Sequence, residues 1–160
     1  MELKGFIVGP ERSGTTLTSA YLSKHPELYI INDPHFLNFF GDLLLTCQSN
    51  NPKYVGIQQL SQSANTLTYK AELQETLRRV KDWYKTWNEF KDDPVEVTRF
   101  YESSEYLISM NVPLVEYFNK FHLSLIPSHI KSEKTSYVIK IPDLARYSFI
   151  TDLLYPDKHI

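Results

Sequence analysis

Cysteine is almost absent from this sequence, because Cys47 is the single one among 160 residues. One cysteine excludes an intramolecular disulfide framework and a cysteine-based metal site. A strong charge of either sign is also missing, since 17 basic and 19 acidic side chains leave a formal net charge of −2 at pH 7. This balance provides no electrostatic footprint for nucleic acid or for an anionic membrane surface.

Long apolar runs, a signal peptide and an Asn-x-Ser/Thr sequon are missing as well. We therefore expect no membrane span, and a cytoplasmic location. The hydrophobic share of 42% and the charged share of 22% suit one globular domain over residues 1–160. Aromatic residues, at 14%, are frequent. We expect most of these rings in the core and some in a pocket for an apolar or ring-bearing ligand.

The first forty residues alternate between strand and helix patterns. An apolar run predicts a strand over 3–8, followed by a glycine-containing loop. Leu17, Ala20 and Tyr21 recur at helical spacing and predict a helix over 15–24, which ends before Pro26. A second strand is expected over 28–31. This order is typical of a parallel α/β sheet with right-handed crossovers.

The middle of the chain has helical periodicity. It predicts helices over 69–90, 95–110 and 113–125, whereas 50–68 is polar and irregular. We interpret 42–131 as a variable, mostly helical insertion. A strand is expected over 137–141, a helix over 145–154, and the first residues of another strand at 158–160.

The loop after the first strand has the Gly-x-x-x-x-Gly spacing of a phosphate cradle, from Gly9 to Gly14. Such glycines let the backbone turn tightly, so that N–H groups and a helix N-terminus point at an anion. In a nucleoside-triphosphate P-loop the second glycine is followed by lysine, but here Thr15 follows it. The cation is Arg12, inside the loop, which argues against an ordinary nucleotide triphosphatase.

This loop resembles the 5′-phosphosulfate loop of sulfotransferases that use 3′-phosphoadenosine 5′-phosphosulfate (PAPS). The resemblance implies a P-loop-like three-layer α/β fold, PAPS as co-substrate and no metal. A loop arginine would neutralise the leaving phosphate. The residues that it implies for donor binding are Pro10, Glu11, Arg12, Ser13, Gly14, Thr15 and Thr16. The two threonines also suit a helix N-terminus as first-turn caps.

Two further segments are similar to bacterial and heparan-type members of this family. Residues 22–28 resemble their helix end and His-Pro turn, and 32–37 resemble their Glu-Pro-His-Phe-Phe segment. Asp33 stands where the family has its candidate general base, one methylene shorter. The alternative is that Asp33 forms an Asx-type turn before Pro34. His35 is the second candidate base, or a structural or substrate-contacting residue.

The last segments also follow the family order. Residues 133–136 are similar to its Glu-Lys-Thr/Ser-Pro element and make Lys134 a candidate for charge neutralisation, although Ser136 replaces the proline. Residues 140–146 and 155–160 resemble the helix and the Pro-Asp-Ala-Lys-Phe-Ile stretch that precede the family's 3′-phosphate-binding arginine. That arginine would follow Ile160, so we expect these residues to be a fragment with little activity alone.

The sequence therefore predicts sulfuryl transfer from PAPS to an acceptor hydroxyl or amine. Arg12, Asp33, His35 and Lys134 are the candidate catalytic residues. A P-loop kinase-like nucleotide binder and a catalytically inactive sulfotransferase-like binding protein are the alternatives. Whether the acceptor is a small molecule, a carbohydrate, a lipid or a peptide stays open, as does the oligomeric state.

Overall fold

The computed structural model describes residues 1–10, 13–51, 53–84 and 94–157, and its centre is a small parallel sheet. Strands β1 (Glu2–Ile7), β2 (Leu28–Asn32) and β3 (Ser136–Lys140) lie in the order β1-β3-β2. Both pairings are parallel, so Ile7, Lys140 and Asn32 lie side by side where the strands end. The expected α/β class is confirmed.

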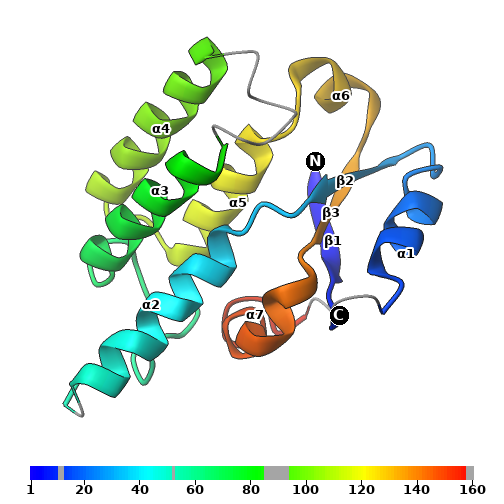
Figure 1. Ribbon diagram of the computed structural model, residues 1–160. Helices are drawn as coiled ribbons and strands as arrows, with labels where there is room; N and C mark the ends of the chain where they lie inside the picture. Colours follow the sequence, from blue (N-terminus) through cyan, green and yellow to red (C-terminus); the bar gives the residue numbers. More distant parts are fainter. Residues whose placement is uncertain (11–12, 52, 85–93, 158–160) are drawn as a thin grey trace.

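Helices cover the two faces of this sheet (Figure 1). Helix α1 (Thr15–Leu22) connects β1 to β2 and lies on one side. The other side carries a group of four helices, whose bounds are α2 (Phe36–Asn50), α3 (Lys70–Tyr84), α4 (Pro94–Ser109) and α5 (Leu114–Ser124). The shorter elements are α6 (Ser128–Glu133), the 3₁₀-helix η1 (Pro142–Tyr147) and α7 (Ser148–Leu154).

Aromatic rings fill the space between α2 and its neighbours. Phe36 is fully buried and its ring centroid lies 4.0 Å from that of Phe121 and 5.7 Å from that of Phe118. Phe40 adds an edge-on contact to Tyr69 at 5.7 Å. Offset and edge-on ring pairs of this kind stabilise a core beyond their buried area. These aromatic side chains lie in the core, as expected.

One polar side chain lies within the same core. His122 of α5 is fully buried, and its ring lies close to a backbone hydrogen-bonding group of Phe118. Burial lowers its pKa to about 3, since desolvation disfavours the charged imidazolium. His122 is therefore a neutral core residue at physiological pH.

Most expected elements are present within a residue or two, including the three strands and the central helices. Four points differ. Helices α2 and α6 were not anticipated as separate elements, and the single helix expected over 145–154 is divided into η1 and α7 at Tyr147. On α1, Leu17 and Tyr21 are 72% and 75% exposed, while the small polar Ser19 is buried. The strand expected at 158–160, and the end of the helix expected over 69–90, lie outside the described residues.

Candidate functional site

The glycine-rich loop follows β1 directly at the carboxyl edge of the sheet. Gly14 is the N-cap of α1, with φ 86°, and α1 has no side-chain cap. A left-handed φ of this size is unstrained only for glycine. The first N–H groups of a helix have no intrahelical partner, so an uncapped N-terminus after a tight loop suits an anion.

The described residues of the loop line one side of an open cavity. A Cβ on Gly9 would lie 2.5 Å from Ser13 Oγ, so these two residues approach closely across the loop. The Ser13 N–H donates to the Pro10 carbonyl at 3.2 Å. Together with β1 and Thr15, these residues line a cavity of about 420 Å³. Glu11 and Arg12 lie outside the described residues, and Thr16 faces a different groove.

An ion pair lies at the same edge of the sheet. Lys140, the last residue of β3, is 8% exposed, and its Nζ donates to Asp33 Oδ2 at 2.9 Å. The backbone N–H of Asp33 also donates to the Lys140 carbonyl at 2.7 Å. Two contacts between the same residues fix the Asp33 carboxylate at the end of β2. Charge-assisted hydrogen bonds of this length are among the stronger ones in proteins.

The turn that follows β2 and contains Asp33 is strained. Asp33 and His35 have φ values of 47° and 49° on either side of Pro34. Left-handed backbone is unfavourable for residues with a Cβ, although Asp and His tolerate it better than most. Strained residues of this kind concentrate at functional sites, where the surrounding structure holds them in place. The strain supports a site at this turn.

His35 lies between the turn and the helical group. Its ring packs edge-on against Trp83 of α3, with centroids 4.6 Å apart, and lies 6.1 Å from Phe39. Burial lowers the His35 pKa, and Lys140 lowers it further, while the charges of Asp33 and Asp143 act in the opposite direction. The lowered pKa favours a neutral imidazole at neutral pH, which is the form that can accept a proton.

Lys134 is not brought together with these residues. It precedes β3, and its Nζ donates to the His25 carbonyl at 3.2 Å, at the amino edge of the sheet. It lies six positions before Lys140 in the chain, about 20 Å at the usual rise of extended backbone. A groove of about 720 Å³ extends from Thr16, Asp33 and Lys140 at one end to Lys134 at the other. The structure therefore puts Lys140, not Lys134, beside the loop and Asp33.

Lys140 is the residue that the sequence reasoning missed as a site residue. Its signal was a lysine at the end of an otherwise apolar strand, Ser-Tyr-Val-Ile-Lys. Lysine is almost never fully buried unless it has a partner. An internal strand that ends in lysine therefore indicates a carboxylate nearby.

Comparisons with protein-family models, with curated proteins and with solved structures found no match to this chain. Within the described part of the chain, no three His, Cys, Asp or Glu side chains form a group that could hold a metal ion. No helix among the described residues is long and apolar enough to cross a membrane.

Proposed function

We propose that this chain is a P-loop-like sulfotransferase that moves a sulfuryl group from PAPS to an acceptor hydroxyl or amine. One observation carries the proposal. The glycine-rich loop, the Asp33–Lys140 pair and His35 are gathered at the carboxyl edge of one parallel sheet. Ligands of open α/β sheets bind outside the carboxyl ends of the strands.

The donor would lie on the loop. Its phosphosulfate would accept hydrogen bonds from the backbone N–H groups of Gly14 to Thr16, at the uncapped start of α1. Arg12, known here only from the sequence, would add positive charge at the leaving phosphate. Lys140 would supply a second cation at the reacting end, in the role that the sequence suggested for Lys134.

The reaction is an in-line displacement at sulfur. The acceptor oxygen or nitrogen forms a bond to sulfur while the bond from sulfur to the phosphate oxygen breaks, and 3′-phosphoadenosine 5′-phosphate (PAP) leaves. The acceptor proton goes to a base at the β2 turn. His35 suits this role because its pKa is lowered and its imidazole is neutral. Asp33 is a weaker candidate, since its Oδ2 already accepts a hydrogen bond from Lys140 Nζ.

The proposal is tested by calorimetric titration with PAP and, separately, with ATP and Mg²⁺. We expect PAP to bind more tightly than ATP·Mg²⁺. Replacing Arg12 with Ala should lower PAP affinity by about tenfold or more, since hydrogen bonds to charged groups contribute about 1.5–3 kcal/mol. Arg78→Ala, on the exposed side of α3, is the matched control and should leave PAP binding unchanged.

Two outcomes would favour other functions. Tighter binding of ATP·Mg²⁺ than of PAP would indicate a kinase-like nucleotide binder. PAP binding that depends on Arg12, but with no sulfuryl transfer to any acceptor tested, would indicate an inactive binding protein. Absence of binding to either nucleotide would refute the proposed donor site.

A further inference from the structure

A cavity of about 490 Å³ lies at the amino edge of the sheet, where β1 and β3 begin. It is lined by Leu3 of β1, Tyr137 of β3, Val115 and Leu123 of α5, and Leu154 of α7. The glycine-rich loop follows the other end of β1, about 15–20 Å away at the usual rise of a strand. A molecule bound in this cavity is therefore not the acceptor of the proposed transfer.

Tyr137 presents to this cavity a hydroxyl that has no hydrogen-bond partner among the described residues. The side chain is 1% exposed, and burial alone raises its pKa, with no contribution from a hydrogen bond. Unlike Asn38 Oδ1 in the core, this hydroxyl is not sealed off by protein atoms, so a ligand can reach it from the cavity. Buried polar groups are nearly always paired, so an accessible exception points to a ligand.

The neighbouring polar groups of the cavity are already paired with each other. The Tyr155 hydroxyl donates to Asn119 Oδ1 at 3.2 Å, and both residues line the cavity. Burial raises the Tyr155 pKa, and the charge of Tyr137 raises it further, so the two phenols are neighbours. A ligand therefore meets a phenol donor next to an amide oxygen that already has a donor of its own.

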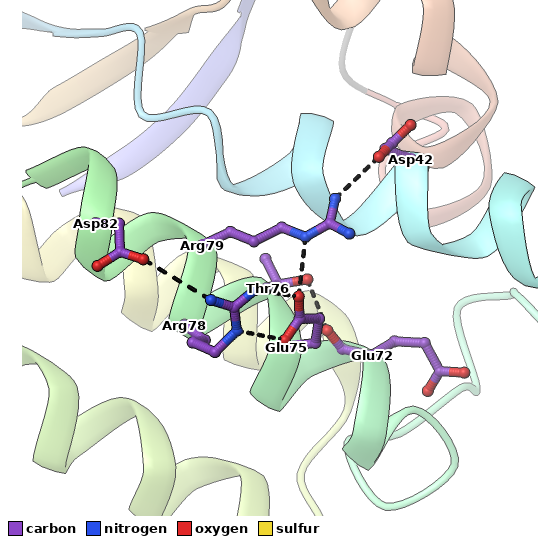
Figure 2. A network of polar contacts seen from close by, with 7 residues as sticks. All are labelled: Asp42, Glu72, Glu75, Thr76, Arg78, Arg79 and Asp82. Atoms are coloured by element: carbon purple, nitrogen blue, oxygen red, sulfur yellow. Dashed lines mark hydrogen bonds and ion pairs between the residues drawn. The ribbon is translucent and has the colours of Figure 1, made fainter.

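The arginine in the cavity beside His35 contrasts with this hydroxyl, because its partners are all within the protein. Arg79 lines that cavity and donates to Asp42 Oδ2 at 2.9 Å and to Glu75 Oε1 at 3.1 Å (Figure 2). Figure 2 also shows Glu75 bound to Arg78, so a network along α3 orients the Arg79 guanidinium. An unmet hydrogen bond therefore distinguishes the cavity at the amino edge.

The walls around Tyr137 are mostly apolar. The charged side chains that line the cavity are the carboxylates of Glu2 and Asp157, and Glu2 is paired with Lys4 at 2.7 Å. No lysine or arginine is among the described residues that line it. An anionic ligand would lose its hydration here without gaining such a partner, whereas an uncharged one would not incur that cost.

We propose that this cavity binds a small uncharged carbonyl compound with an apolar ring, whose carbonyl oxygen accepts a hydrogen bond from Tyr137. A carbonyl needs only a donor, whereas a ligand hydroxyl would also need an acceptor for its own hydrogen. The volume lies within the range of 300–1,000 Å³ typical of small-molecule sites. Binding requires neither PAPS nor the glycine-rich loop, so failure of either proposal leaves the other standing.

The test compares probes built on one ring by ligand-observed NMR: acetophenone, its hydrocarbon analogue α-methylstyrene, the alcohol 1-phenylethanol, and benzoate. We expect acetophenone to bind saturably, with a Kd of about 1 mM or tighter. Benzoate should bind at least about tenfold more weakly, because its carboxylate loses hydration. No saturation below about 10 mM acetophenone, or tighter binding of benzoate or 1-phenylethanol than of acetophenone, would overturn the proposal.

Tyr137→Phe removes only the hydroxyl oxygen. It should weaken acetophenone binding about fivefold and leave α-methylstyrene within about twofold, since the hydrocarbon accepts no hydrogen bond. The urea midpoint should not change, because the hydroxyl has no partner among the described residues. Tyr21→Phe, at a side chain that is 75% exposed on α1, is the matched control and should alter neither probe. Equal effects of Tyr137→Phe on both probes would refute the hydrogen bond.

Val115→Phe tests the location of the ligand by filling the cavity from α5. It should weaken acetophenone and α-methylstyrene alike, by about tenfold or more. Val55→Phe, at a valine that is 50% exposed outside the cavity, is the control and should leave both unchanged. A Val115→Phe protein that is folded by circular dichroism and binds acetophenone normally would refute the assignment, and Tyr137→Phe decides it if Val115→Phe does not fold.

Discussion

The Asp33–Lys140 pair provides a sharp test because its two members differ in burial. The Lys140 side chain is 8% exposed and that of Asp33 is 33% exposed. Removing one partner leaves the other charge uncompensated, and the penalty depends on how well water reaches it. We therefore expect Asp33→Asn, which strands the buried ammonium, to be more destabilising than Lys140→Met, which strands a carboxylate that water can reach.

The magnitudes follow from the same numbers. Breaking a fully buried pair costs about 3–5 kcal/mol, and partial exposure of one partner lowers this to about 2–3 kcal/mol for Asp33→Asn. Lys140→Met should cost about 1 kcal/mol, since its alkyl chain is replaced by a similar apolar volume. Asparagine tolerates the left-handed backbone at position 33, so the first change tests mainly charge.

The assay is urea unfolding followed by circular dichroism at pH 7.5, for both single variants and the double variant. In the double variant neither charge is left without its partner. Its loss of unfolding free energy should therefore be smaller than the sum of the losses in the two single variants, by about 1 kcal/mol or more. Equal losses for the two single variants, or an additive double variant, would refute the account of the pair.

Three other predictions use the same unfolding assay. Lowering the pH from 7.5 to 5.0 should reduce the free energy of unfolding by about 2 kcal/mol through His122, because the unfolded state binds a proton below pH 6.5 while the buried imidazole, with its pKa lowered to about 3, does not. His122→Gln should remove this part of the pH dependence. If the free energy of unfolding of His122→Gln changes with pH as much as that of the unmodified protein, the prediction is wrong. Gly41→Ala should lower the free energy of unfolding by about 1–3 kcal/mol, because its Cβ would lie 2.6 Å from Tyr147 Cδ1. The Cβ of Gly14→Ala would meet no atom within 4 Å, so this variant should lose only about 1 kcal/mol, from the left-handed φ alone. A larger loss of stability at Gly14 than at Gly41 would contradict this reasoning. Arg79→Met should cost less than about 1 kcal/mol, because the carboxylates that it binds are well solvated, and a loss above about 2 kcal/mol would show that the network does more than orient the guanidinium.

The strands and the central helices could be predicted because their patterns are local. The run Phe6-Ile7 and the run Ile30-Ile31 are apolar and bounded by turn residues, and Leu73, Leu77 and Val80 mark one face of α3. Helix α2 lacks that contrast. Its first half is buried almost all round, so no polar face revealed its period.

The candidate site could be predicted only in part. The glycine-rich loop is a contiguous motif, and Asp33 and His35 follow a strand end, so their common edge follows from parallel topology. The partner of Asp33 is 107 positions away along the chain, and no local pattern indicates it. On α1, the spacing of Leu17, Ala20 and Tyr21 predicted the helix but not its orientation, because the buried residues of this helix are the small polar Thr15 and Ser19.

The strand order β1-β3-β2 has a consequence for how the chain folds during synthesis. The central strand is the last of the three to be made, and it separates the two earlier strands, which do not pair with each other. Until Ser136–Lys140 leaves the ribosome, β1 and β2 have no neighbour within this sheet, while α2, α3, α4 and α5 can already pack together. Long-range parallel pairing is slow to form. We therefore expect the helical group to fold first and the edge that carries the loop, Asp33 and Lys140 to assemble in the final step.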